Sequence, residues 1–124
     1  MLSQETLVSF LATTDAARAR AFYEGALGLT LIGDHEHLMT FQSGAARIAL
    51  QKGVQANPRA GTSLGWDVTD IRATMRDLMS RGVVFERFEG MEQDDLGVWS
   101  PMPGTGVAWF KDPDGNLLSL SQGA

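Results

Sequence analysis

Hydrophobic and polar positions alternate along several short stretches of the chain, and two other stretches show helical spacing. Alternation predicts strands with one buried face, whereas apolar residues three and four positions apart predict amphipathic helices. The expected helices lie at 16–28 and 71–82. Their apolar stripes consist of Ala19, Phe22, Tyr23, Ala26 and Leu27 in the first helix, and Ile71, Met75, Leu78 and Met79 in the second.

The two helices belong to an internal repeat. Asp15 and Asp70 are 55 positions apart (70 − 15), and the glycines that close the helices keep this spacing to within one residue. Either these aspartates or the threonines before them can accept hydrogen bonds from the first N–H groups of each helix. The order strand, helix and three shorter strands occurs twice, so the sequence predicts two βαβββ units.

The units also define the expected organisation of the single domain, residues 1–124. The first unit spans about 5–54, residues 55–62 form a linker, and the second unit spans about 63–122. Residues 90–105, rich in Gly, Pro, Asp and Met, are expected to form a long irregular loop, which makes them a candidate functional segment. The strands expected after the helices are 29–32, 38–42 and 46–51 in the first unit, and 83–88, 106–111 and 117–121 in the second.

Two motifs link the chain to a known family. They are AFYEGALGL at 21–29, where the first helix ends, and FKDPDGNLLSL at 110–120, the C-terminal hairpin. With the doubled unit, they make the chain resemble the vicinal-oxygen-chelate superfamily of glyoxalases, extradiol dioxygenases, fosfomycin-resistance enzymes and bleomycin-resistance proteins, over about residues 5–122. The resemblance implies an α+β fold with a cupped, eight-stranded mixed sheet, helices on its convex side, a ligand cavity on its concave side, and a homodimer.

The same resemblance points to positions where related proteins bind metal. Metal-using members hold a divalent ion with His, Gln or Glu on the first and last strands of each unit, which matches Val8, Ala49 or Gln51, Ser63 and Ser119 here. Valine and alanine have no lone pair to donate, and serine hydroxyls are weak ligands. Ser119 stands where the family pattern has glutamate. We therefore expect no metal and no other cofactor.

Strand alternation and the long loop supply the expected ligand contacts. Val8, Phe10 and Ser63 share the face of the family's metal positions. Trp109 and Phe110 must point to opposite faces, and the resemblance favours Phe110 as core and Trp109 toward the cavity. The aromatic and methionine side chains of the loop either anchor it or cover a pocket. The predicted ligand-binding residues are Val8, Phe10, Ser63, Trp99, Met102, Trp109 and Ser119.

Candidate catalytic residues are few. The chain has no cysteine and no recognisable Ser/His/Asp arrangement, and His35-Glu36-His37 is interpreted as a hairpin end. Asp67 is the one carboxylate expected to face the cavity, where it would serve acid–base chemistry. Its alternative role is that of an exposed or hydrogen-bonded carboxylate near a strand end. Residues 86–95 include five acids and one arginine, which indicates a solvated loop or a rim that attracts cationic ligands.

Charge and composition narrow the choice of partners. Ten basic and fifteen acidic residues give a net charge of −5, which disfavours nucleic acid and anionic membranes. No apolar run approaches the roughly 18 residues that a membrane span needs, and the N-terminus has no secretory pattern. We expect a cytoplasmic protein with no nucleic-acid or membrane partner.

These observations leave three function classes. The leading hypothesis is a metal-independent protein that binds and sequesters a small molecule, as bleomycin-resistance proteins do; the ligand would be neutral or cationic, and apolar or aromatic. The alternative is a glyoxalase- or dioxygenase-type enzyme with a non-standard metal site or with metal-free chemistry through Asp67. The third class is an interaction module without a ligand. Whether the protein is an enzyme stays open at this point.

Overall fold

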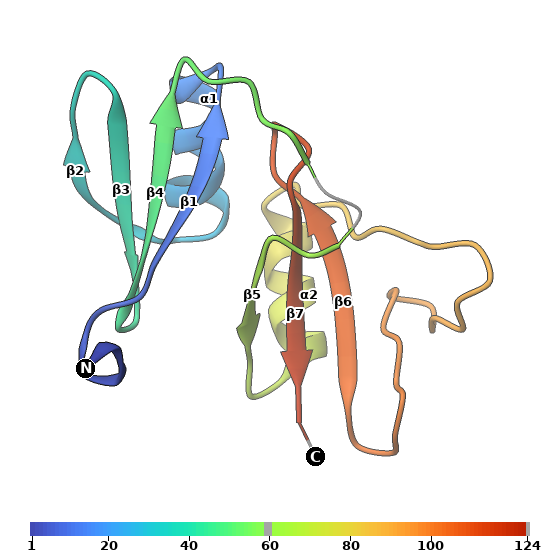
Figure 1. Ribbon diagram of the computed structural model, residues 1–124. Helices are drawn as coiled ribbons and strands as arrows, with labels where there is room; N and C mark the ends of the chain where they lie inside the picture. Colours follow the sequence, from blue (N-terminus) through green and yellow to red (C-terminus); the bar gives the residue numbers. More distant parts are fainter. Residues whose placement is uncertain (59–60, 124) are drawn as a thin grey trace. The chain divides into compact units, whose positions relative to one another are not determined.

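The computed structural model describes residues 1–58 and 61–123, and the chain forms two compact units, Met1–Asn57 and Pro58–Ala124. Each unit has one β-sheet with a helical segment on one of its faces (Figure 1). The predicted α+β class is confirmed. The predicted linker at 55–62 includes residues 59 and 60, which lie outside the described residues. No helix in the described part of the chain is both long and apolar enough to cross a membrane.

The first unit contains a four-stranded sheet in the order β1-β4-β3-β2. Strand β1 pairs with β4 in parallel, and the other neighbours are antiparallel. Its elements are η1 (Leu2–Gln4), β1 (Val8–Thr13), α1 (Ala16–Arg20), the π-helical segment η2 (Ala21–Ala26), β2 (Thr30–Asp34), β3 (Leu38–Ser43) and β4 (Ala46–Lys52). The exposed residues 35–37 join β2 to β3, as predicted for this hairpin end.

The first helical segment begins as the sequence predicts and then widens. The Oδ1 atom of Asp15 accepts a hydrogen bond from the Arg18 N–H at 3.0 Å, so the aspartate caps α1. In η2 the Leu27 N–H donates to the carbonyl of Phe22 at 2.9 Å, five residues back, whereas the sequence predicted one continuous α-helix. The segment still buries Tyr23 completely, because the wider turns keep this side chain toward the sheet.

The core of the first unit lies between this segment and one face of the sheet. Tyr23 packs against Phe41 of β3 with ring centroids 5.8 Å apart, and the exposed fraction of both side chains is 0%. On the opposite face of the sheet, Phe10 of β1 is 61% exposed and Val8 is 37% exposed. The further buried apolar residues of this unit are Ala19, Met39, Ile48, Ala49, Leu50 and Ala56.

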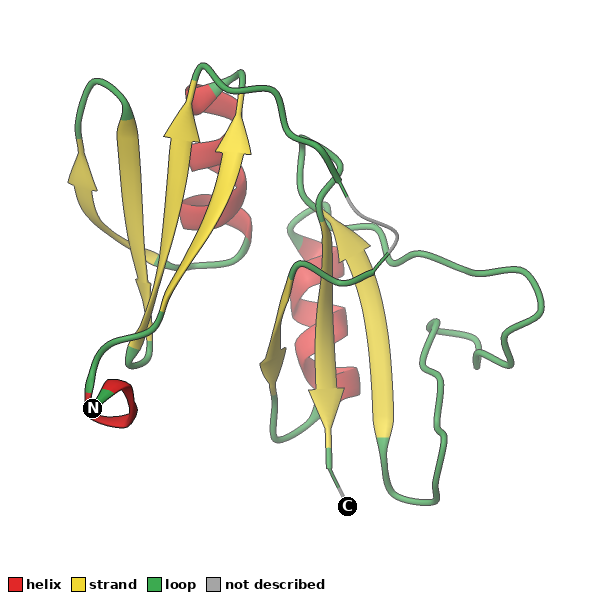
Figure 2. Cartoon of the chain, in the orientation of Figure 1, coloured by secondary structure: helices red, strands yellow, loops and turns green. Residues whose placement is uncertain are grey.

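The second unit contains a three-stranded sheet in the order β5-β7-β6, with α2 on one face (Figures 1 and 2). Strands β5 and β7 are parallel, whereas β6 and β7 are antiparallel. Asp70 caps α2, because its Oδ1 accepts a hydrogen bond from the Ala73 N–H at 3.1 Å. The elements are β5 (Leu64–Asp67), α2 (Ile71–Ser80), β6 (Gly106–Lys111) and β7 (Leu117–Gln122).

The strand predicted at 83–88 does not form, so the described residues contain seven strands instead of eight. Phe85 makes an isolated bridge with Phe110, and the Glu86 N–H donates to the Trp109 carbonyl at 2.7 Å. Farther along the same edge of β6, Trp99 pairs with Val107. Because two short segments share this edge, neither extends into a strand, and residues 81–105 form a long loop beside β6 (Figure 2).

The core of the second unit lies between α2 and its sheet. Phe110 is fully buried, as predicted, and its ring stacks on that of Trp66 with centroids 6.4 Å apart. Ile71, Met75 and Leu78 are buried as the helical stripe predicts, but Met79 is 45% exposed. Met79 lies at the edge of the helical stripe and stays exposed, so the prediction that Met79 belongs to the core was wrong.

The turn between β6 and β7 is formed as predicted. The buried Asp112 carboxylate accepts hydrogen bonds from the Asp114 N–H at 3.0 Å and from the Asn116 N–H at 2.9 Å. Its other oxygen accepts from the Asn116 side-chain amide at 2.9 Å. Gly115 has a φ of 91°, which a side chain would disfavour. The acidic residues here therefore organise a β-turn.

Candidate functional site

An aromatic cluster lies on the face of the second sheet opposite to α2. In β6, Ala108 and Phe110 are fully buried, so the alternating Trp109 points to the other face, where it is half-buried. Its ring meets that of Phe88 edge-to-face with centroids 5.5 Å apart, and that of Trp99 at 6.2 Å with a tilt of 32°. The Trp109 Nε1–H donates to the Thr62 hydroxyl at 3.2 Å, which fixes the orientation of the indole.

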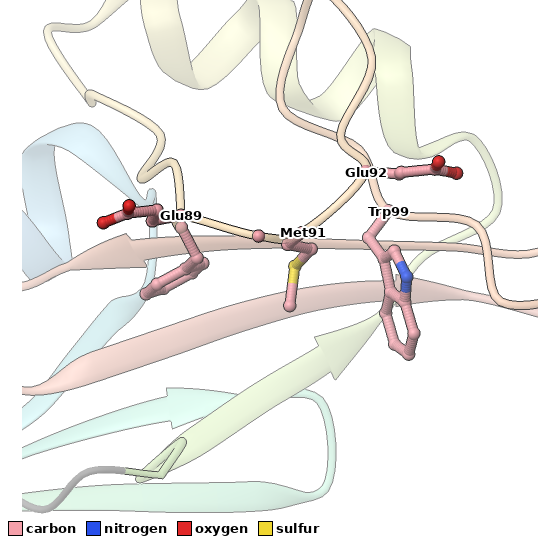
Figure 3. A pocket seen from close by; sticks show the side chains of 6 residues that line it. Glu89, Met91, Glu92 and Trp99 are labelled. Carbon is pink, nitrogen blue, oxygen red and sulfur yellow. The ribbon is translucent and has the colours of Figure 1, made fainter.

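A pocket of about 440 Å³ adjoins this cluster. In Figure 3 the side chains of Met91 and Trp99 extend to the same side of the loop, whereas the carboxylates of Glu89 and Glu92 lie at opposite ends of the group. Gly90 has a φ of 80°, and this left-handed conformation turns the chain between the apolar wall residues. The lining consists of Phe88, Glu89, Gly90, Met91, Glu92 and Trp99.

The loop that forms the pocket is held by hydrogen bonds from Gln93. The Gln93 Oε1 accepts from the Phe88 N–H at 2.8 Å, and its Nε2 donates to the carbonyls of Glu86 at 3.1 Å and Gly97 at 2.8 Å. On the other wall, the Trp99 N–H donates to the Val107 carbonyl at 2.9 Å and its carbonyl accepts in return at 2.8 Å. Both aromatic walls therefore have fixed backbones.

The charges around the pocket are mostly negative. Glu89 and Glu92 are exposed at its rim. The positive charges nearby have other contacts: Lys111 lies 3.6 Å from Glu86, and Arg87 donates to the carbonyl of Asp95 at 2.7 Å. An apolar pocket with a few polar groups at its rim is the usual form of a small-molecule site, and this rim suits a cationic or neutral molecule.

The structure brings together some of the predicted ligand-binding residues of the second unit. Trp99 lines the pocket, the ring of Trp109 contacts the rings of Phe88 and Trp99 that line it, and Ser119 of β7 is the register partner of Trp109. Ser63 is exposed just before β5, where its N–H donates to the Leu117 carbonyl at 2.8 Å. Met102 is 64% exposed on a separate turn of the loop. Their roles as ligand contacts stay predictions.

Val8 and Phe10, the predicted ligand contacts of the first unit, lie on the open face of its sheet. In the parallel register Phe10 pairs with Ala49, and in the second unit Gly65 pairs with Ser119. Phe10 and Gly65 are thus equivalent positions, 55 residues apart (65 − 10), which matches the repeat. A Cβ atom at Gly65 would lie 2.2 Å from the Ser119 hydroxyl oxygen, so only glycine leaves room for this serine.

The positions matched to the family's metal ligands do not fit a metal ion. Val8 and Ala49 offer only alkyl groups, and Ser63 and Ser119 offer neutral hydroxyls. Gln51, the alternative to Ala49, is exposed at the end of β4. Among residues 1–58 and 61–123, no three His, Cys, Asp or Glu side chains gather as metal ligands would.

Asp67, the candidate for acid–base chemistry, lies at the end of β5. Its Oδ1 accepts a hydrogen bond from the Ser121 hydroxyl at 2.6 Å, and the residue is exposed. In this geometry the Asp67 carboxylate is a hydrogen-bonded group at a strand end, which is the alternative role given for it above.

Phe88, Glu89, Gly90 and Glu92 line the pocket but were not among the predicted site residues. Phe88 was assigned to a strand that does not form, so its place beside Trp109 could not be derived from alternation. The run of acidic residues with a glycine and a methionine between them was the available signal, because such a run indicates an exposed loop.

Comparisons with known proteins identify the family. A model of the Glyoxalase/Bleomycin resistance protein/Dioxygenase superfamily matches residues 6–120. The chain belongs to this superfamily, which confirms the resemblance found in its sequence. No curated protein sequence matches the chain significantly.

Solved structures of low sequence identity share the fold. A putative glyoxalase family protein from Bacillus anthracis is 19% identical with a TM-score of 0.75, covering 98% of this chain and 96% of that one. The antibiotic binding protein TnmS3 from Streptomyces sp. CB03234 is 22% identical with a TM-score of 0.72, covering 97% and 96%. The fosfomycin resistance protein FosX from Mesorhizobium loti is 15% identical with a TM-score of 0.71, covering 100% and 95%.

Proposed function

We propose that the protein binds and sequesters an apolar or aromatic small molecule, neutral or cationic, without a metal ion. The observation that carries this proposal is the pocket of about 440 Å³ between Phe88, Met91 and Trp99, with Glu89 and Glu92 at its rim. Aromatic and methionine side chains offer large apolar contact areas, and the carboxylates would favour a positive charge. That TnmS3 is an antibiotic binding protein of the same fold supports this class of function.

Titration with two aromatic dyes tests the proposal. Nile red is neutral and crystal violet is cationic, and binding of either is read from dye or tryptophan fluorescence. Met91→Ala should weaken the affinity for both dyes about fivefold, because it removes apolar contact area from the wall. Met79→Ala is the matched control, since it makes the same change on the exposed side of α2. Equal effects of the two variants would contradict the pocket assignment.

The charge preference has its own test. Replacing both rim carboxylates, by Glu89→Gln and Glu92→Gln, should weaken crystal violet binding several-fold and leave Nile red binding within about twofold. The dye recovered after long incubation should be chemically unchanged, as sequestration requires. A new product would favour the enzyme alternative instead.

The proposal includes a homodimer. Leu7, Phe10 and Ile32 of the first unit are 71%, 61% and 46% exposed, and large exposed apolar side chains favour association. Light scattering should give about twice the chain mass of 13.4 kDa, and a monomer at micromolar concentration would contradict this part. The cytoplasmic location and the lack of a nucleic-acid partner stay predictions of the sequence.

A further inference from the structure

A single carboxylate organises the turn between the two walls of the pocket. The Asp94 Oδ1 accepts hydrogen bonds from the N–H groups of Leu96 at 3.0 Å, Gly97 at 3.1 Å and Val98 at 2.9 Å. Its Oδ2 accepts from the guanidinium of Arg72, on α2, at 2.5 Å. One side chain therefore ties three backbone groups of the loop to the helix of the same unit.

The tied turn is continuous with both walls. Gln93, the preceding residue, receives the Phe88 N–H on its side-chain oxygen at 2.8 Å and donates to the Gly97 carbonyl at 2.8 Å. Val98, at the other end of the turn, is only 2% exposed and precedes Trp99, whose backbone pairs with Val107. Movement of the turn would thus move the wall that contains Phe88 relative to Trp99.

The base of the loop fits closely against the second unit. A Cβ atom built on Gly106 would lie 2.9 Å from a methyl carbon of Val98 and 3.5 Å from one of Ile71. The Trp99 side of the pocket is therefore anchored in the core, whereas the Phe88 side is held by the ring contact with Trp109 and by the hydrogen bonds of Gln93, which adjoins the turn that Asp94 organises. Arg87 adds to these bonds, because its Nη2 donates to the carbonyls of Asp94 and Asp95, each at 2.7 Å.

We infer that Asp94 is a positioning residue for ligand binding: by joining the 96–98 turn to Arg72, it holds Phe88 and Met91 in place opposite Trp99. The inference rests on the proposed function, because the walls that it positions are those of the proposed binding site. A wall ordered before the ligand arrives loses less conformational entropy on binding, so affinity rises without any contact between Asp94 and the ligand.

Asp94→Asn separates positioning from direct contact. The amide oxygen of asparagine can still accept backbone N–H groups, but its NH₂ group cannot accept from Arg72. Nile red is the probe, because a neutral dye does not respond to the lost charge through long-range attraction. Asp94→Asn should weaken Nile red affinity about fivefold to tenfold, and Asp95→Asn, the same change at the neighbouring exposed position, should keep it within about twofold.

Hydrogen exchange supplies a readout that needs no ligand. Asp94→Asn should speed the exchange of the Phe88 N–H and of the amides at 96–98, and leave those of Leu118 and Leu120 in β7 unchanged. Arg72→Gln, which removes the same contact from the helix side, should act in the same direction with a smaller effect. Because Arg72→Gln is the milder substitution, it can be measured even if Asp94→Asn folds poorly.

The outcomes distinguish the inference from the proposed function. Unchanged exchange at Phe88 in both variants, or equal affinity losses for Asp94→Asn and Asp95→Asn, would overturn the inference. If the unaltered protein binds neither Nile red nor crystal violet while exchange at Phe88 still rises in Asp94→Asn, the proposed function fails and the structural role of Asp94 is confirmed.

Discussion

The two units begin alike and differ after their helices. In the first unit, the chain turns from η2 into β2 and β3, and this hairpin, with one register shift between Leu31 and Gly33, completes a four-stranded sheet. In the second unit, the equivalent stretch makes two isolated contacts with β6 and otherwise forms a loop of 25 positions (81–105). The candidate pocket lies in that loop. One copy of a repeat can thus keep the scaffold while the other replaces a strand with a loop that forms a pocket.

Truncating one buried phenylalanine ring in each unit should give the largest effects and distinguish the two units. Phe41→Ala and Phe110→Ala each remove a fully buried ring and should each lower the free energy of unfolding by about 3–5 kcal/mol. All three tryptophans, Trp66, Trp99 and Trp109, lie in the second unit. Denaturation gives the free energies, and native emission should shift only for Phe110→Ala. The same shift for Phe41→Ala would break the comparison.

A methyl group at two glycines should give the next largest difference. In Gly65→Ala the new Cβ would lie 2.2 Å from the Ser119 hydroxyl oxygen and 2.9 Å from its carbonyl oxygen, so we expect a loss of about 1–3 kcal/mol in denaturant unfolding. Adding Ser119→Ala should recover part of it. A Cβ built at Gly25 of the first unit would meet no atom of another segment within 4 Å, so Gly25→Ala should be neutral or slightly stabilising. An equal loss at both sites would contradict the packing described.

The aspartates that cap the two helices should contribute similar amounts to the stability of the two units. Asp15→Ala and Asp70→Ala each remove a hydrogen bond to a first-turn N–H and should cost about 0.5–2 kcal/mol in thermal or denaturant unfolding. Asp77→Ala, which removes only an exposed pair with Arg81 at 3.5 Å, should cost less than about 0.5 kcal/mol. A loss of stability in only one of the two variants would show that the two caps do not stabilise their helices equally.

Acid titration should give the smallest effect, through one aspartate in each unit. The hydrogen bond from Lys52 lowers the pKa of Asp34 in the first unit. Burial acts to raise the pKa of Asp94, but the N–H of Val98 and the guanidinium of Arg72 outweigh it and hold the pKa below the usual 3.8. Both carboxylates therefore stabilise the fold above a pH near 3.8, and this contribution is lost as the pH falls through their lowered values.

Single asparagine variants check this prediction. Asp34→Asn and Asp94→Asn should each flatten the decline of unfolding free energy below about pH 4. Glu36→Gln, a change at an exposed carboxylate of the β2–β3 turn, should leave the decline unchanged. If Asp34→Asn and Asp94→Asn both kept the full decline, the lowered pKa values would be wrong.

Much of the fold could be predicted because its signals are local. The aspartate caps, the buried stripes and the turn at 112–115 depend on residues close in sequence, and the doubled unit follows from their repetition. The π-helical widening of η2 and the loss of a strand at 83–88 could not be predicted. Phe85 and Trp99 compete for one edge of β6, and that competition is set by tertiary contacts.

The candidate site was accessible to prediction only in part. Alternation and the family resemblance placed Trp109 on the face opposite to Phe110, and the loop composition drew attention to Trp99, which lines the pocket. Their roles as ligand contacts stay predictions. Phe88 is held by the hydrogen bond from its N–H to the Gln93 side chain, next to the turn that the carboxylate of Asp94 organises. Such bonds join positions of irregular backbone, where no periodicity exists to reveal them.

Mapping a bound dye by NMR shows whether the loop at 81–105 forms the binding site. In ¹H–¹⁵N spectra of the protein with crystal violet, we expect the largest shift changes at the amides of 88–92 and at the indole N–H groups of Trp99 and Trp109. The indole of Trp66, which packs on Phe110 on the helix side of the sheet, should change little. Largest changes on β1 around Phe10, with the loop unaffected, would contradict the claim that the second unit's loop forms the binding site.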